Sequence, residues 1–318
     1  MVGVGLLFPG QGAQAVGMGR EFYEKSEKAQ ALFKKADHIL GFPLSKIIFE
    51  GPEEELTKTS NSQPAIYVTS LAALEVLKEK IPSLKISSAC GLSLGEFSSL
   101  AALGVFSFEE GLKLVWARGR FMDEAGAKRK GGMVSIVGLS LDICQQIAKE
   151  SAVEVANINS PEQIVLSGEA QFIERAAKLA EEKGAKRALV LKVSGAFHSS
   201  LMDEAADRLK ALLTPIPFKV PQGLFLSNVT GDFEQNLEKI KENLGRQVTQ
   251  SVQWVKTIER LASQNEKYFV ELAPGKVLKG LARRIQKEVQ VDNLETVSDL
   301  DKIAESIKQK SEEALHAS

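Results

Sequence analysis

The chain has 318 residues, a formal net charge of −1 and a hydrophobic fraction of 44%. This length can bury the core of one large domain and a smaller one, and the composition is that of an ordinary globular protein. The charge gives no basic excess for nucleic acid, and no apolar run reaches the length of a membrane span. We therefore expect a protein that acts without nucleic acid or a membrane.

Two cysteines, Cys90 and Cys144, form no metal or redox spacing, as is usual in a reducing cytosol. The first eight residues lack the basic start and the cleavage site of a signal peptide, and they read as a strand. The sequence therefore predicts a cytoplasmic protein with no metal and no cofactor.

The first third of the chain alternates strand and helix patterns. Two apolar runs predict buried strands, at residues 3–8 and 85–92. Apolar residues at helical spacing predict three helices, at residues 21–40, 96–103 and 108–122. The second strand, a tight glycine turn and a helix thus follow one another around Ser93.

The middle of the chain has a β-α-β-β-α-β order of predicted elements. The strands are expected at 133–137, 153–158, 163–167 and 187–193. The helices are expected at 141–150, capped by Ser140, and at 170–183. This order is the split βαβ unit, so we expect a ferredoxin-like small domain over residues 129–195, entered through a loop at 126–132. Residues 1–128 and 196–318 then form one discontinuous large domain.

The last third returns to the large domain. Two apolar runs predict buried strands, at 223–227 and 268–272. Helical spacing predicts helices at 253–262 and 276–287, and a charged helical tail with a frayed end from Asp299. The fold class is α/β with a parallel-sheet core.

Gly91-Leu92-Ser93-Leu94-Gly95 matches the G-x-S-x-G nucleophile elbow. In such an elbow a serine sits on a strained turn between strand and helix, and the glycines allow close packing of the neighbouring elements. The alternative is a serine in an ordinary glycine-rich turn. The position between a predicted strand and a predicted helix favours a nucleophile.

A nucleophilic serine needs a base, and the chain has three histidines. His316 lies in the charged tail, and His38 lies in an early helix with the pattern of a surface residue. His198 follows the last strand of the predicted small domain, in a loop that contains glycine. If a histidine activates Ser93, His198 is therefore the candidate.

The chain resembles the malonyl-CoA:acyl carrier protein transacylases, the loading enzymes of bacterial fatty acid synthesis. The matching stretches run in the family's order over nearly the whole chain: residues 8–14, 62–65, 91–98, 118–122, 157–161, 195–202 and 273–278. The resemblance implies an α/β-hydrolase-like large domain with a ferredoxin-like insert. It also implies transfer of a malonyl group from malonyl-CoA to the phosphopantetheine thiol of acyl carrier protein, through a malonyl-serine ester.

Catalytic roles follow from the resemblance residue by residue. It implies that Ser93 attacks the thioester and that His198 takes its proton. A main-chain carbonyl, here that of Gln247, is implied to orient the histidine in place of a triad acid. The main-chain amides of Gln11 and Leu94 are implied to form the oxyanion hole.

The resemblance also implies an acyl pocket. Arg118 is implied to bind the free carboxylate of the malonyl group, and a guanidinium fork suits a carboxylate physically. Gln63 and Asn157 are implied to line the same pocket. An aromatic residue at the position of Phe197 goes with malonyl rather than methylmalonyl groups in related acyltransferases. Many relatives have histidine where this chain has Leu92, so any polar role of that side chain is absent.

Carrier proteins of this kind are acidic, which predicts a basic docking surface near the pocket. The first candidates are Arg283 and Arg284, together with Lys279 and Lys287. The second candidate is the pair Lys186 and Arg187. Two other functions remain open: an esterase or thioesterase of related fold, and a scaffold that only binds the carrier protein.

Overall fold

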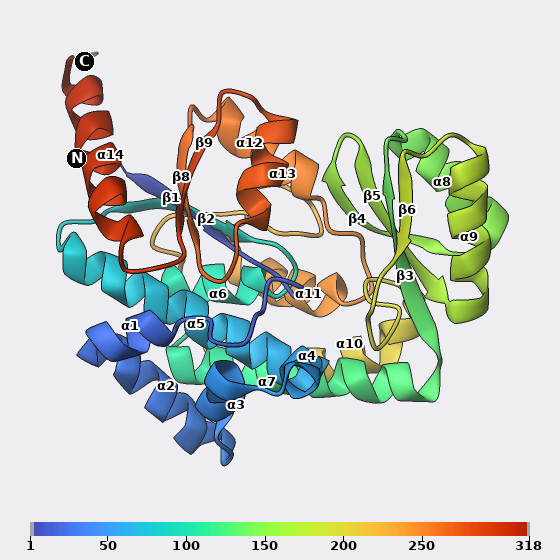
Figure 1. The fold of residues 1–318 in the computed structure, drawn as a ribbon, viewed down its shortest axis with the longest axis horizontal. Helices are drawn as coiled ribbons and strands as arrows, with labels where there is room; N and C mark the ends of the chain where they lie inside the picture. The colour runs from blue at the N-terminus through green and yellow to red at the C-terminus, as the bar shows by residue number, and fades with distance from the viewer. Residues whose placement is uncertain (1–2, 317–318) are drawn as a thin grey trace.

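The structure is a computed structural model that describes residues 3–316, with side chains described through residue 313. It contains two separate sheets, one parallel and one antiparallel, which lie side by side in Figure 1. None of the helices within the described residues combines the length and the apolar character that a membrane span requires. The α/β class with a parallel core is confirmed.

The larger part of the chain is built on a parallel sheet with strand order β7-β2-β1-β8-β9. Its strands are β1 (Val4–Phe8), β2 (Ile86–Gly91), β7 (Leu224–Phe225), β8 (Tyr268–Leu272) and β9 (Gln290–Leu294). Every residue of β1 and β8 is buried, as expected where both faces of a parallel sheet are covered. Phe8 pairs with Gly91 at the ends of β1 and β2. The loops that follow these strands therefore leave the sheet next to each other.

Two long helices, α5 (Thr59–Lys80) and α7 (Phe108–Lys128), run together along one side of this sheet (Figure 1). No amphipathic pattern predicts α5, because the helix is buried on nearly all sides and has no polar face. The start of α7 is fixed by a capping box between Ser107 and Glu110.

The other helices of the larger part are α1 (Arg20–Lys25), α2 (Glu27–Leu40), α3 (Leu44–Glu50), α4 (Glu53–Thr57), α6 (Gly95–Ala102), α10 (Asp203–Leu213), α11 (Leu237–Gln247), α12 (Trp254–Ser263), α13 (Val277–Ile285) and α14 (Asp299–His316). The single helix predicted over 21–40 was wrong. The chain breaks at Ser26, whose hydroxyl accepts a hydrogen bond from the Ala29 amide and begins a second helix.

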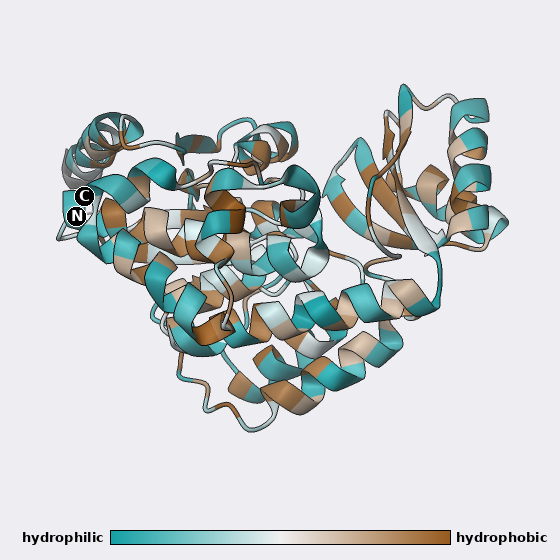
Figure 2. Cartoon of the chain, turned by 60° about the horizontal axis from the view of Figure 1, so that its bottom comes forward, coloured by the Kyte–Doolittle hydropathy of each residue, from teal (hydrophilic) through white to brown (hydrophobic). Residues whose placement is uncertain are grey.

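The antiparallel sheet has strand order β4-β5-β3-β6, the ferredoxin-like arrangement. Its elements are β3 (Gly131–Val137), α8 (Leu141–Ser151), β4 (Glu154–Ser160), β5 (Gln163–Glu169), α9 (Ala170–Glu182) and β6 (Arg187–Val190). The strands and the two helices enclose a hydrophobic core of their own. In Figure 2 the helices of this part, at the right, show mostly hydrophilic residues on the side away from the strands. The domain boundaries at 128/129 and 195/196 stay a prediction.

The connection into the antiparallel sheet differs from the loop expected at 126–132. Helix α7 continues to Lys128, and β3 already begins at Gly131. Gly126 belongs to the last turns of that helix, where a Cβ atom would lie 2.3 Å from the Ser194 carbonyl oxygen. Its glycine therefore permits a close helix–loop contact and does not mark a flexible linker.

Candidate active site

The nucleophile elbow forms where β2 turns into α6. Ser93 has a φ of 52°, in the left-handed region that non-glycine residues rarely adopt. A Cβ on Gly91 would lie 2.1 Å from the Gly95 carbonyl carbon, and one on Gly95 would lie 2.1 Å from the Phe8 oxygen. Both glycines are therefore required for the strand and the helix to meet at this turn. The turn leaves the Ser93 side chain facing a cavity.

His198 lies against the nucleophile. Its Nε2 is 2.8 Å from Ser93 Oγ, and its Nδ1 is 2.7 Å from the main-chain oxygen of Gln247. Because a carbonyl only accepts hydrogen bonds, Nδ1 carries the proton and Nε2 is left to accept from Ser93. Burial, and then the charge of Arg118, lower the pKa of His198 to about 4. The imidazole is therefore neutral at neutral pH and can take a proton.

Arg118 reaches the same serine from α7. Its Nη2 donates to Ser93 Oγ at 3.0 Å and to Gln247 Oε1 at 2.8 Å, while Nη1 donates to Gln63 Oε1 at 2.8 Å. The residue is 1% exposed, and burial lowers the pKa of its guanidinium to about 10, which leaves it charged at neutral pH. Among the described residues its Nε has no hydrogen-bond partner. Gln63 lies fully buried behind Arg118 and does not line the cavity itself.

Two main-chain amides are free at the elbow. Leu94 immediately precedes α6, and Gln11 follows β1 on the neighbouring loop. Within residues 3–316 neither amide N–H makes a main-chain hydrogen bond. The Gln11 side chain is occupied elsewhere, because its Nε2 donates to Thr59 Oγ1 at 3.3 Å. This leaves the main chain of Gln11, together with the start of α6, available to a developing negative charge.

The cavity in front of Ser93 has a volume of about 400 Å³ and opens between the two sheets. Gln11, Arg118 and His198 line it from the larger part. Asn157 lines it from β4, and Phe197 from the loop after β6. The Leu92 side chain also reaches this wall and packs against the hydrophobic cluster around Trp254. All cavity-lining residues that were predicted from the sequence thus meet in one place, apart from Gln63.

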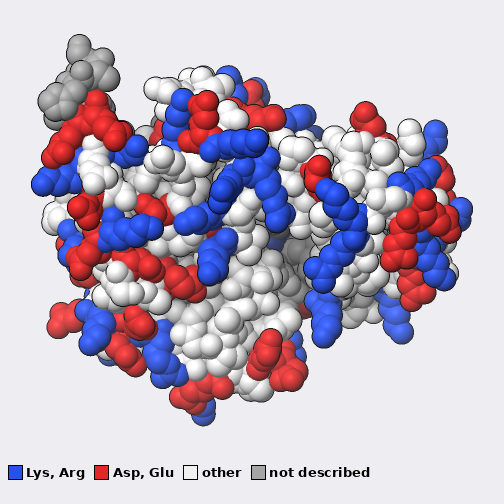
Figure 3. All heavy atoms as spheres, turned by 45° about the horizontal axis from the view of Figure 1, so that its top comes forward, with Lys and Arg blue, Asp and Glu red and all other residues white. Residues whose placement is uncertain are grey.

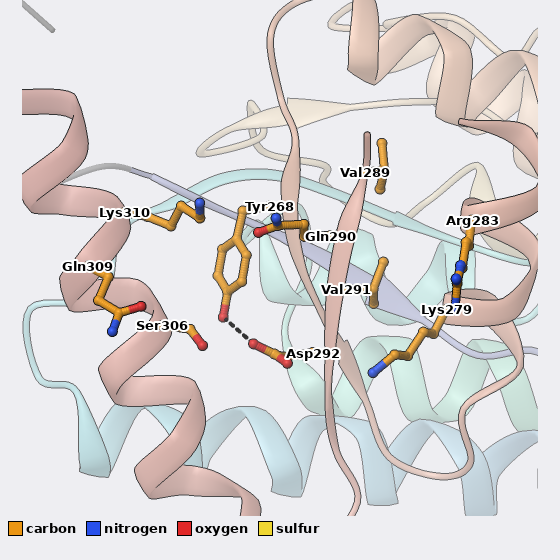
Figure 4. Close-up of a pocket in the computed structure, with 10 residues that line it drawn as sticks. All are labelled: Tyr268, Lys279, Arg283, Val289, Gln290, Val291, Asp292, Ser306, Gln309 and Lys310. Atoms are coloured by element: carbon orange, nitrogen blue, oxygen red, sulfur yellow. Dashed lines mark hydrogen bonds between the residues drawn. The ribbon is translucent and has the colours of Figure 1, made fainter. Parts of the chain in front are cut away.

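A second hollow of about 490 Å³ lies between β9, α13 and α14 (Figure 4). Polar residues such as Tyr268, Asp292 and Arg283 line it together with two valines, and it contains neither Ser93 nor His198. Arg283 therefore does not line the catalytic cavity itself, although Val277 and Leu281 of the same helix do. Across the described part of the chain, no cluster of acidic, histidine or cysteine side chains is arranged to hold a metal ion.

Two polar residues of the site were not predicted from the sequence. Glu96 is fully buried in the first turn of α6 and contacts the Gln247 side chain. Asn228 accepts from the Ser93 amide at 2.7 Å and donates to the Gly91 oxygen at 2.8 Å. The strand order could have indicated Asn228. This residue follows β7, which lies beside β2, so it leaves the sheet next to the turn that carries Ser93.

Comparison with known proteins agrees with the geometry. The family described as "Acyl transferase domain" matches residues 6–312. The malonyl CoA-acyl carrier protein transacylase of Bacillus subtilis (strain 168) is 39% identical over 98% of this chain and 99% of that protein. The crystal structure of an acyl-carrier-protein-S-malonyltransferase from Bartonella henselae superposes with a TM-score of 0.92 at 37% identity, covering 96% of this chain and all of that one (100%).

A second similar structure is a malonyl-transacylase in complex with a type II PKS acyl-carrier protein. It has a TM-score of 0.91 and 36% identity, and the match covers 96% of this chain and 100% of that one. These similarities extend over nearly the whole length of the chain, and the family match spans the segment that contains the elbow. The chain therefore belongs to the acyl transferase domain family, and within it to the malonyl CoA-acyl carrier protein transacylases.

Proposed function

We propose that this enzyme transfers the malonyl group from malonyl-CoA to the phosphopantetheine thiol of acyl carrier protein, and so supplies fatty acid synthesis. One observation carries the proposal: a buried, charged Arg118 donates to the same Ser93 Oγ that a neutral His198 contacts. A nucleophile beside a fixed cation suits an acyl group that ends in a carboxylate. Arg118 also lines the cavity, so its guanidinium lies where an acyl group attached to Ser93 would extend.

The first half-reaction forms a malonyl-serine ester. Ser93 Oγ attacks the thioester carbonyl, and its proton passes to Nε2 of His198. The amides of Gln11 and Leu94 stabilise the oxyanion that forms at the carbonyl. The carbon–sulfur bond then breaks, and the coenzyme A thiolate leaves with the proton that His198 returns.

The second half-reaction reverses these roles. The carrier thiol gives its proton to His198 and attacks the ester carbonyl, and Ser93 Oγ leaves and recovers a proton. The Gln247 carbonyl supports the imidazolium that forms in each half-reaction. A cytoplasmic enzyme fits the two free, buried cysteines, Cys90 and Cys144.

An assay with malonyl-CoA and holo carrier protein tests this function against the two others. We expect malonyl carrier protein to form faster than free malonate. Release of malonate at an equal rate with and without the thiol would identify a hydrolase. Carrier binding with no consumption of malonyl-CoA would identify a scaffold.

Phe197 is expected to restrict the size of the acyl group. It is 6% exposed and lines the cavity beside His198, so its ring occupies space that a branched acyl group needs. We expect Phe197→Ser to raise loading from methylmalonyl-CoA relative to malonyl-CoA by about tenfold to a hundredfold, the usual range for one added carbon in a pocket. Phe218→Ser is the control, since this similarly buried ring (8% exposed) packs on Phe106 outside the cavity. An unchanged ratio in the Phe197 variant would assign the ring to loop packing alone.

The carrier protein is expected to dock at the cavity mouth. Figure 3 shows Lys and Arg side chains on both sides of the hollow between the two parts of the molecule. Helix α13 borders this hollow, because its Val277 and Leu281 line the catalytic cavity. Lys192 lines the cavity from the other side. An acidic partner would meet positive charge on both sides of the opening.

Reversal of Arg283 and Arg284 to glutamate is expected to raise the KM for the carrier protein. Charges at the rim of an interface mainly set the rate of association. We therefore expect KM to increase about tenfold at low salt and by less at high salt. Self-acylation by malonyl-CoA should stay near that of the parent. The matched control reverses Lys28 and Lys34, two exposed cations on the distant helix α2. Equal use of the carrier at low salt by both reversed variants and the parent would refute docking on α13.

A further inference from the structure

Glu96 is a buried acid that the proposed chemistry does not use. It lies one turn beyond the nucleophile, is 0% exposed and does not line the cavity. One carboxylate oxygen accepts from the main-chain amide of Asn228 at 3.1 Å, and the other accepts from Nε2 of Gln247. A carboxylate without solvent is costly unless such donors stabilise it, so its presence beside the elbow needs a reason.

The Gln247 side chain connects Glu96 to the rest of the site. Its Nε2 also donates to the Ser93 carbonyl oxygen at 2.8 Å, and its Oε1 accepts from Arg118 Nη2 at 2.8 Å. An ionised carboxylate can only accept and a guanidinium can only donate. Glu96 on one side and Arg118 on the other therefore fix which end of the Gln247 amide faces each of them.

Asn228 connects Glu96 to the elbow by a second route. Its main-chain amide donates to Glu96, while its side chain bonds both the Ser93 amide and the Gly91 carbonyl. These bonds hold the turn in which Ser93 has a positive φ. A change at Glu96 therefore reaches the nucleophile as well as the arginine.

We propose that Glu96 is a positioning residue that acts in its ionised form, through Gln247 and Asn228, to aim Arg118 and hold Ser93 for malonyl transfer. The inference rests on the proposed function and extends it to a residue outside the cavity. Glu96 makes no contact with the substrate in this proposal. It determines the positions of Arg118 and Ser93, which do contact the substrate.

The ionised form is accessible near neutral pH. Burial raises the pKa of Glu96 to about 7, against the opposing effect of its amide donors and of Arg118. Besides Arg118, the titratable group found to interact with it is the Cys90 thiol, whose pKa burial raises so far that it stays neutral. As pH falls through about 7, Glu96 takes up a proton on one carboxyl oxygen. The donor at that oxygen, which is Asn228 N or Gln247 Nε2, then faces a hydroxyl group and no longer has a charged acceptor.

This predicts that kcat/KM for malonyl loading of Ser93 declines below about pH 7. The decline is separate from protonation of His198, whose pKa of about 4 lies well below. Acetyl loading, which does not need Arg118, should decline less over the same range.

The test replaces Glu96 by glutamine. In Glu96→Gln one amide N–H must face another donor, either at Gln247 or at Asn228. We expect malonyl loading at pH 8 to fall about tenfold to a hundredfold, the usual effect of a buried polar group left without its partner. Acetyl loading should fall less, and the decline near pH 7 should disappear. Glu96→Asp keeps the charge and should restore part of the malonyl rate and the pH dependence.

Glu271→Gln is the matched control, because Glu271 is also 0% exposed and accepts from two main-chain amides, those of Leu278 and Lys279. It bonds none of the catalytic groups. We expect it to lower Tm as Glu96→Gln does while the ratio of malonyl to acetyl loading and the pH profile stay those of the parent.

An unchanged ratio and an unchanged pH profile in Glu96→Gln would overturn the inference. So would an equal change of ratio in the Glu271 variant. If Glu96→Gln does not fold, the test uses Glu96→Asp and the pH profiles of malonyl and acetyl loading by the parent enzyme. Identical pH profiles for the two acyl groups would then overturn the inference. Absence of malonyl loading in the parent would instead refute the proposed function.

Discussion

Ser93→Ala is expected to abolish malonyl transfer, with a loss of about 10⁴-fold to 10⁶-fold, and His198→Ala is expected to come close to it. The alanine variant has no oxygen to form the ester. Without the imidazole, Ser93 keeps its proton at neutral pH, because the ring 2.8 Å away was its acceptor. The two residues act as one unit, so the double variant should cost little more than either single one.

Transfer from malonyl-CoA to holo carrier protein, measured at neutral pH, checks this expectation. His38→Ala is the control for the histidine, since His38 is exposed on α2. It should keep the parental rate. Near-normal acylation of Ser93 in the His198 variant would show that another group takes the proton.

Arg118→Ala is expected to change which acyl group the enzyme loads. This substitution removes the cation that binds the malonyl carboxylate. Because truncation of one partner of a buried charge pair is costly, we expect the rate of malonyl loading to fall by about two to three orders of magnitude. Acetyl loading should hold or rise, because a buried guanidinium facing a neutral acyl group is a penalty that the variant no longer carries. The ratio of malonyl to acetyl loading should therefore fall sharply.

Single-turnover loading from malonyl-CoA and from acetyl-CoA gives this ratio. Arg120→Ala is the matched control on the same helix. Its side chain is 48% exposed, with a 3.7 Å contact to Glu124, and it lies over the Trp116 ring. This variant should leave the ratio unchanged. Equal losses for both acyl groups in Arg118→Ala would make that arginine a structural residue.

Periodicity predicted most strands and the β-α-β-β-α-β order of elements in the smaller part, because burial of one face gives a regular pattern of apolar residues in the sequence. It did not predict α5, which is buried on nearly all sides, and it joined α1 to α2 across the cap at Ser26. Helix α11 was also absent from the prediction, although its last residue is Gln247. A helix buried on nearly all sides, such as α5, has too little contrast between its faces for such a pattern to show. Helix α11 does bury one face, at Ile240 and Leu244 among others, so its pattern was present in the sequence and was overlooked.

The elbow predicted Ser93 because its spacing has a steric cause, and the scarcity of histidine singled out His198. The roles of Gln247 and Gln11 came from family resemblance, since a main-chain carbonyl or amide leaves no mark on residue type. Glu96 was missed because its partner Asn228 lies 132 positions away and only the tertiary fold brings them together.

The central claim is that Ser93 carries the malonyl group between two thiols. Intact-protein mass spectrometry after mixing with malonyl-CoA tests it most directly, with peptide mapping of the modified residue. We predict a gain of one malonyl group on Ser93, which disappears when holo carrier protein is added and reappears on the carrier. No adduct in the parent, or an adduct that persists in Ser93→Ala, would contradict the account.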